Sequence, residues 1–151
     1  MTGLVRLSAA LALVIGPVLG CVDATSPDSE LEAARRRWAD SGPTSYAITI
    51  SRSCECTPEM TGPVVVSVRN RVVESRTYTR TGTAVASGSI ELFPSVEGLF
   101  RLIADAIAQR AASLVVRYDP TLGHPIVISI DWDADTVDDE VAYQVRELVL
   151  R

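Results

Sequence analysis

The spacing of apolar residues along the chain switches between two periods, and this pattern limits the possible folds more than any other feature of the sequence. Apolar side chains recur every three or four residues up to about residue 41, then every second residue in three segments between residues 44 and 78. The helical spacing returns after Ser95, and three further alternating segments follow. A period near 3.6 is typical of an amphipathic helix and a period of two of a strand with one buried face. The predicted order is therefore α-β-β-β-α-β-β-β.

Capping signals mark where the two helices begin. Asp28 or Ser29 can cap the first helix, with Glu32 completing a capping box, and Ser95 can cap the second. Because the strands are short and separated by turns, we expect an α+β fold. In this fold an antiparallel sheet of about six strands carries the second helix as its core helix, and the N-terminal helix flanks it.

The first residues of the chain predict a lipoprotein signal peptide. One charged side chain, Arg6, precedes an uncharged apolar run that is shorter than the about 20 residues needed to span a bilayer. The run ends in Val-Leu-Gly-Cys at residues 18–21, which resembles the lipobox of bacterial lipoproteins, where the cysteine thiol receives a diacylglycerol. The alternative is an ordinary signal peptide with a free or disulfide-bonded Cys21.

This interpretation divides the chain into three parts: a signal peptide over 1–20, a lipid-anchored tether over 21–29 and a single globular domain over 30–151. Acyl chains such as palmitate contribute about 0.8 kcal/mol per buried methylene, so several chains make an effectively permanent anchor. We therefore expect an extracytoplasmic, membrane-anchored protein of the cell envelope. Val22 follows Cys21, so the inner-membrane retention signal of enteric-type bacteria, an Asp at that position, is absent. Its absence favours the outer membrane in a cell that has one.

With Cys21 assigned to the lipid, Cys54 and Cys56 remain as a C-x-C pair. In a compartment where disulfides persist they can bridge each other or another chain. Residues two apart in a flat strand are separated by about 6.5–7 Å, at the limit of disulfide reach, so a bridge between them requires a local bend. Free thiols, a metal site or a thiol-redox role with Arg52 as the evident cationic neighbour are the alternatives.

Charge and composition exclude several classes of function. The chain has a formal net charge of −5 and contains no lysine. Phosphate-dominated binding needs a basic surface, so we expect no nucleic-acid partner. The lack of lysine excludes Schiff-base, P-loop and Ser-Lys chemistry. Since the single histidine, His124, lies in a turn between a glycine and a proline, we assign no catalytic residues and no cofactor.

An acidic segment over 131–140 begins with the D-x-D-x-D pattern of an EF-hand calcium loop. Its sixth position is Thr136 instead of Gly, and its twelfth is Ala142 instead of the bidentate Glu. We therefore favour a solvated acidic turn between two strands and assign no metal site, with calcium binding as the alternative.

Three consecutive arginines, Arg35, Arg36 and Arg37, lie on the predicted first helix. They fit either a solvated helix face, which we favour, or contact with anionic lipid headgroups. Trp38 is expected to pack beneath this helix.

Several residues together form a recognisable set, in which Y-D-P-x-x-G-x-P over 118–125 and D-D-E over 138–140 are the most specific. The others are Trp38, Tyr46, the C-x-C pair, Leu99-Phe100 and Ile128-x-Ile130-Asp131. The set resembles an uncharacterised family of bacterial lipoproteins, known as a domain of unknown function, over about residues 30–150. The resemblance supports export and the fold, and it implies no activity. An aromatic residue is common in that family at the position of His124, which argues against a catalytic imidazole there.

These observations favour a lipid-anchored, non-enzymatic binding or envelope-associated module. Its predicted partners are the membrane, through the anchor, and an envelope protein or ligand. The alternative is a calcium-dependent module using residues 131–140 or a thiol-redox module using Cys54 and Cys56.

Overall fold

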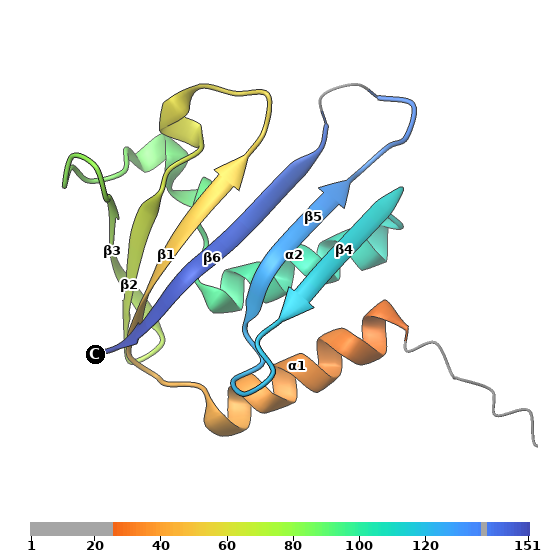
Figure 1. Ribbon diagram of the computed structural model, residues 1–151, viewed down its shortest axis with the longest axis horizontal. Helices are drawn as coiled ribbons and strands as arrows, with labels where there is room; N and C mark the ends of the chain where they lie inside the picture. Colours follow the sequence, from red (N-terminus) through yellow and green to blue (C-terminus); the bar gives the residue numbers. More distant parts are fainter. Residues whose placement is uncertain (1–25, 137–138) are drawn as a thin grey trace, which may run out of the picture.

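The computed structural model of the protein describes residues 26–136 and 139–151. Its elements follow the predicted order, with two short 3-10 helices, η1 and η2, inserted in the connections (Figure 1). The helices and strands are α1 (Pro27–Ser41), β1 (Tyr46–Ser53), η1 (Pro58–Met60), β2 (Val64–Arg69), β3 (Val72–Tyr78), η2 (Ser87–Leu92), α2 (Val96–Gln109), β4 (Ser113–Tyr118), β5 (Pro125–Asp131) and β6 (Val141–Leu150).

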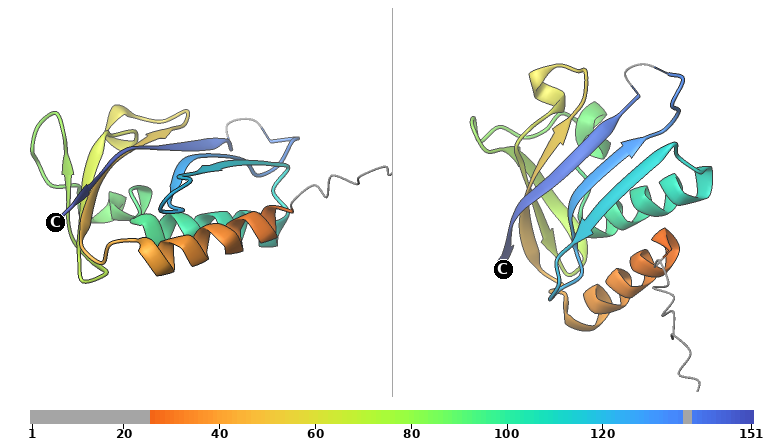
Figure 2. Two further views of the ribbon diagram at one scale, coloured as in Figure 1. Left: turned by 60° about the horizontal axis from the view of Figure 1, so that its bottom comes forward. Right: turned by 45° about the vertical axis from the view of Figure 1, so that its right-hand side comes forward.

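The six strands form one antiparallel sheet in the order β3-β2-β1-β6-β5-β4. The first and last strands, β1 and β6, lie side by side at its centre and are paired from Tyr46↔Leu150 to Ser53↔Ala142. Both α1 and α2 cover the same face of the sheet (Figure 2). Helices segregated on one face of an antiparallel sheet make an α+β architecture, which confirms the predicted fold class.

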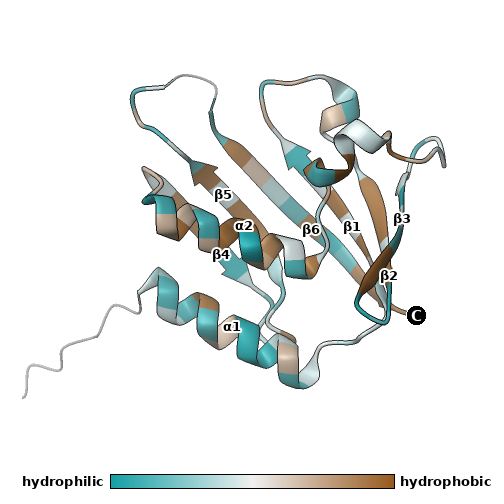
Figure 3. Ribbon diagram, turned by 180° about the vertical axis from the view of Figure 1, so that it is seen from behind, coloured by the Kyte–Doolittle hydropathy of each residue, from teal (hydrophilic) through white to brown (hydrophobic). Residues whose placement is uncertain are grey.

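Strand residues alternate between the face under the helices and an open face, as their period of two predicted. The covered face is built from fully buried apolar side chains, which include Tyr46, Ile48, Ile50, Val64, Val66, Val68, Ile128 and Ile130. Burying one side chain of this kind stabilises the fold by roughly 1.5–3 kcal/mol. Figure 3, seen from the helix side, shows hydrophobic residues concentrated in the strands behind the helices and hydrophilic residues along α1.

The core helix is α2, and the predicted cap is confirmed, since Ser95 Oγ accepts a hydrogen bond from the backbone N–H of Gly98 at 3.3 Å. The helix ends at Arg110, which adopts a left-handed conformation with φ of 56°. Its buried residues lie at helical spacing and contact the sheet: Val96, Leu99, Phe100, Ile103 and Ala106.

The first helix, α1, begins earlier than predicted. Ser26 is the N-cap, and its Oγ accepts from the backbone N–H of Ser29 at 3.3 Å. Pro27 occupies the first helical position, where a missing N–H costs no hydrogen bond. The prediction that Asp28 or Ser29 caps this helix with Glu32 is therefore wrong, and residues 27–29 are helix. The buried residues of α1 are Leu31, Ala34 and Trp38.

The N-terminal predictions fall outside the described residues. They are the signal peptide over 1–20 and the lipid-bearing Cys21. Within 26–136 and 139–151, no helix has the length and apolar character needed to cross a bilayer.

Candidate functional site

The two remaining cysteines lie together just beyond the end of β1. The sulfur atoms of Cys54 and Cys56 are in contact as in a disulfide, and their Cα atoms are 5.3 Å apart. This separation is shorter than in a flat strand because the chain bends, with the N–H of Cys56 donating to the carbonyl of Cys54 at 2.9 Å. The local bend that a bridge requires is therefore present.

Arg52 lies against both sulfur atoms. Its Nη1 is 2.7 Å from Sγ of Cys54 and 3.6 Å from Sγ of Cys56. Its Nε is buried and has no hydrogen-bond partner within the described part of the chain. Both cysteines are half-buried, so a cation and a partly accessible sulfur pair lie side by side.

The Y-D-P-x-x-G-x-P segment is a packed turn. The Asp119 carboxylate accepts from the N–H groups of Thr121 at 3.0 Å and Leu122 at 2.7 Å. A Cβ added to Gly123, whose φ is +82°, would lie 2.4 Å from the carbonyl oxygen of Ala34 in α1. The motif therefore packs the β4–β5 turn against α1, and the role of its residues is structural.

His124 belongs to the same turn and is buried, with its ring 5.9 Å from that of Trp38. Burial lowers the pKa of His124, and the nearby charge of Asp119 raises it by less. A neutral imidazole held against an indole suits a core position.

The acidic segment over 131–140 includes residues 137–138, which lie outside the described residues. Asp133 accepts from the N–H of Asp135 at 3.0 Å and from the hydroxyl of Thr136 at 3.2 Å. The carboxylate oxygens of Asp133 thus stabilise the turn by hydrogen bonds within it. In the portion of the chain that is described, no three His, Cys, Asp or Glu side chains are grouped to hold a metal ion.

The arginines of α1 differ from one another. Arg35 is tied down, because it donates to Glu32 at 3.1 Å and to the carbonyl of Phe100 in α2 at 3.1 Å. Arg36 and Arg37 are exposed.

A part-buried polar cluster that the sequence analysis missed joins α1, β1 and α2. The Glu97 carboxylate accepts from the Tyr46 hydroxyl at 2.7 Å and from Trp38 Nε1 at 3.2 Å. The same hydroxyl accepts from the N–H of Val96 at 3.1 Å. Burial, followed by the hydrogen bond to Glu97, raises the pKa of Tyr46 far above its ordinary value. Trp38 packs beneath α1 as predicted, and the cluster is a structural clamp.

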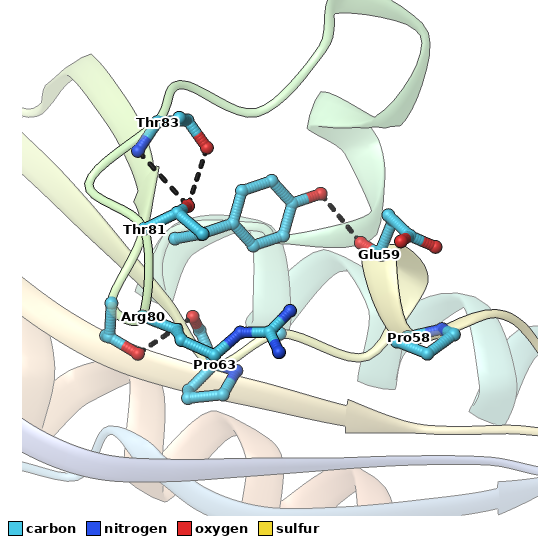
Figure 4. A pocket seen from close by; sticks show the side chains of 9 residues that line it. Pro58, Glu59, Pro63, Arg80, Thr81 and Thr83 are labelled. Atoms are coloured by element: carbon cyan, nitrogen blue, oxygen red, sulfur yellow. Dashed lines mark hydrogen bonds between the residues drawn. The ribbon is translucent and has the colours of Figure 1, made fainter.

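A pocket of about 570 Å³ lies between η1 and the chain that leaves β3 (Figure 4). Its walls come from two connections, residues 58–63 and residues 78–83. The lining residues are Pro58, Glu59, Gly62, Pro63, Tyr78, Thr79, Arg80, Thr81 and Thr83. None of these residues belongs to a motif, so the sequence did not indicate them as site residues.

Hydrogen bonds hold the two walls of this pocket in position. The Tyr78 hydroxyl donates to the carbonyl of Glu59 at 2.7 Å, and the N–H of Thr79 donates to the carbonyl of Pro63 at 3.0 Å. The Tyr78 ring also packs edge-on against Phe93 with centroids 6.1 Å apart. The pocket is therefore preformed.

Two charged groups of the pocket form no ion pair with any described residue. Ion pairs in the described residues join Arg35 to Glu32 and Arg69 to Glu74, so Arg80 and Glu59 form none there. The pKa of Glu59 is lowered, first by hydrogen bonds from its own backbone N–H and from Thr57, and to a smaller extent by the charge of Arg80. Glu59 is therefore ionised at neutral pH.

Comparison with known protein families identifies a family model that covers most of the chain. A model described as "Family of unknown function (DUF6174)" covers residues 30–150. No curated protein and no solved structure matches the chain.

Proposed function

The chain belongs to DUF6174, a family of unknown function, and we propose that it is a lipid-anchored extracytoplasmic protein that binds a small ligand in the pocket between η1 and residues 78–83. The role is non-enzymatic: the protein holds its ligand at the envelope and does not transform it. If the ligand is a group on the surface of an envelope protein, that group would bind in the same pocket.

The pocket is the observation that carries this proposal. Its volume of about 570 Å³ falls in the range of roughly 300–1,000 Å³ that holds small molecules in proteins. It also combines apolar walls with a few polar groups, the composition that gives a ligand both affinity and orientation.

The lipid anchor rests on the lipobox at residues 18–21, and the fold suits it. Residues 22–26 separate Cys21 from α1, a reach of at most about 20 Å when fully extended. The start of α1 would thus lie close to the membrane. The pocket-forming segments η1 and 79–83 lie at the other end of the molecule from the start of α1 (Figures 1 and 2), so the pocket would lie far from the anchor.

The anchor is tested by fractionation and acyl labelling of the full-length protein and Cys21→Ala. We expect the natural protein to incorporate labelled palmitate and to remain with membranes after washing in high salt, and the variant to do neither. A Cys21→Ala protein that still sediments with membranes would contradict the anchor.

Ligand binding is tested by saturation-transfer NMR of the full-length protein in detergent micelles, with a mixed library of neutral, anionic, cationic and zwitterionic small molecules. Thr81→Trp should fill the pocket and abolish the signals that the natural protein gives. Thr121→Trp, at another exposed threonine, is the matched control and should preserve them. Signals that survive in Thr81→Trp, or an absence of signals in the natural protein, would refute this pocket as a binding site.

Thiol–disulfide exchange at the C-x-C pair is a second candidate function, favoured by the position of Arg52. A substrate thiolate would attack Sγ of Cys56, and Cys54 would leave as a thiolate stabilised by the guanidinium 2.7 Å away. A second substrate thiolate then attacks the substrate sulfur of the mixed disulfide. This closes the substrate disulfide and releases Cys56 as a thiolate. The substrate loses two electrons and two protons, and Cys54 and Cys56 become thiols.

This candidate is tested with a synthetic dithiol peptide and the oxidised full-length protein. We expect stoichiometric oxidation of the peptide, slowed about tenfold or more in Arg52→Gln and unchanged in Arg101→Gln, an exposed arginine of α2. Peptide oxidation no faster than with the Cys54→Ser/Cys56→Ser protein would refute it.

A further inference from the structure

We propose that the pocket takes a zwitterion, an amino acid or short peptide with free termini, whose carboxylate binds Arg80 and whose ammonium group binds Glu59. The inference rests on the proposed binding function and names the ligand class of that same site.

The first observation is that two opposite charges line the pocket and are exposed to solvent. An arginine stays protonated at any physiological pH, and the exposed Glu59 carboxylate, whose pKa is lowered by hydrogen bonds from its own backbone N–H and from Thr57, is ionised at neutral pH as well. Neither residue takes part in the ion pairs of the described chain. A ligand with one anionic and one cationic group would satisfy both.

The second observation is the spacing of these charges. Arg80 and Glu59 line the same pocket from its two walls, and among the described residues the two side chains do not form an ion pair. Figure 4 shows the Arg80 guanidinium directed into the space between Pro58 and Pro63, with Glu59 on the neighbouring wall. The gap between the charges is where the ammonium and carboxylate groups of a ligand would lie.

The third observation is the charge balance, which disfavours the other ligand classes. A purely anionic ligand attracted by Arg80 would meet the carboxylate of Glu59, and a purely cationic ligand would meet the guanidinium. A neutral apolar ligand would leave both charges partly desolvated without partners, which is costly. A zwitterion pairs with each charge in turn, and a guanidinium suits the bidentate geometry of a carboxylate.

The walls between the charges fit the rest of an amino acid or dipeptide. Pro58 and Pro63 provide rigid apolar surfaces, and the Tyr78 ring is fixed by its hydroxyl bond to Glu59 and its contact with Phe93. Threonine hydroxyls, those of Thr81 and Thr83 lying 2.7 Å apart, border the pocket and can bond a peptide group.

The test is isothermal titration of the full-length protein in detergent with three probes. These are the dipeptide leucyl-alanine, its N-acetylated form and its C-terminal amide. Each cap removes one charge, and we expect each to weaken binding by about tenfold or more, as a charged hydrogen bond is worth roughly 1.5–3 kcal/mol.

Two variants assign each end of the ligand. Arg80→Gln should bind leucyl-alanine more weakly and no longer distinguish it from the C-terminal amide, while still binding the acetylated form less well than the free dipeptide. Glu59→Gln should bind leucyl-alanine more weakly and no longer distinguish it from the acetylated form, while still binding the amide less well than the free dipeptide. Arg101→Gln, exposed on α2, is the matched control and should bind all three probes as the natural protein does. Both pocket side chains are exposed, and thermal melts check that each variant remains folded.

The outcomes separate this inference from the proposed function. Equal binding of the three probes, or an acetylated dipeptide that binds as well as the free one, would overturn the zwitterion assignment. The zwitterion assignment would also be wrong if leucyl-alanine does not bind while another library member gives signals that Thr81→Trp abolishes. In that case the proposed binding function would stand. If no molecule gives such signals, both proposals fail.

Discussion

Gly123 marks the contact between the Y-D-P-x-x-G-x-P turn and α1, and we expect Gly123→Ala to destabilise the fold much more than a comparable substitution elsewhere. With a φ of +82°, the residue is in the left-handed region, and an added Cβ would lie 2.4 Å from the Ala34 carbonyl oxygen and 2.8 Å from Cβ of Arg37. The turn and α1 would have to move apart. Gly82 has a similar φ of +68° but no atom within 4 Å of the added Cβ, so Gly82→Ala is a matched control.

The expected magnitudes follow from these two environments. Left-handed backbone costs a residue with a Cβ about 1–2 kcal/mol, and both variants bear this cost. Forcing extra volume into a packed contact adds typically about 1–3 kcal/mol, and only Gly123→Ala bears it. The free energy of unfolding should therefore fall by about 2–5 kcal/mol in Gly123→Ala and by about 1–2 kcal/mol in Gly82→Ala. At roughly 4 °C per kcal/mol for a domain of this size, Tm should fall by about 8–20 °C and about 4–8 °C.

The measurement is thermal unfolding of the full-length protein followed by circular dichroism, with urea unfolding to give the free energies. The spectrum of folded Gly123→Ala should match that of the natural protein, because the strands do not depend on this contact. If the two alanine variants differ by less than about 0.5 kcal/mol, the scatter within which independent mutational effects add, the close approach of Gly123 to α1 is not a packing constraint.

Three further perturbations have defined outcomes. Tyr46→Phe leaves the buried N–H of Val96 without its acceptor and should cost about 1–3 kcal/mol in urea unfolding; a cost near zero would mean that water replaces the hydroxyl. Burial lowers the pKa of His124 below its ordinary value of 6.5, so as pH falls the unfolded chain takes up this proton first and stability declines below about pH 6.5. His124→Phe should remove that part of the decline, and equal pH slopes for the two proteins would contradict the assignment. Replacing Cys54 and Cys56 together by Ser should cost no more than about 1.6 kcal/mol, since closing so short a loop removes little chain entropy. A larger loss would show that the pair supports more than its own turn.

The fold was predictable because its signals are local. The alternation in β1, β2, β4 and β6 and the cap at Ser95 depend on residues close in the sequence, and both agree with the structure. The start of α1 was predicted wrongly because two capping solutions compete within four residues. Ser26 followed by Pro27 prevails, since a proline at the first helical position is already set to the helical φ.

The candidate site was not predictable because it depends on strand register. Pairing of Val64 with Tyr78 places the open end of the β2–β3 hairpin so that residues 58–63 and 79–83 lie side by side. The sequence indicates a hairpin, but a shift of one residue in register would move every side chain of β3 to the other face. The pocket therefore exists only once the register is known. The clamp of Tyr46 on Glu97 was missed for a similar reason, because its partners are 51 residues apart.

The residues that form recognisable motifs and the residues that line the pocket are separate sets, so the scaffold and the charge of the pocket depend on different residues. Asp119 and Gly123 are used in fixing the β4–β5 turn on α1, while Arg80 and Glu59 are exposed and hold no element of the core together. Substitutions at exposed positions of this kind usually change stability by less than about 0.5 kcal/mol. The charge of the pocket can therefore be changed by substitution while the scaffold stays the same. Arg80→Glu is the direct test: it should leave Tm nearly unchanged and shift the preference of the pocket from zwitterions to cations, and a large fall in Tm would show that pocket and scaffold are coupled.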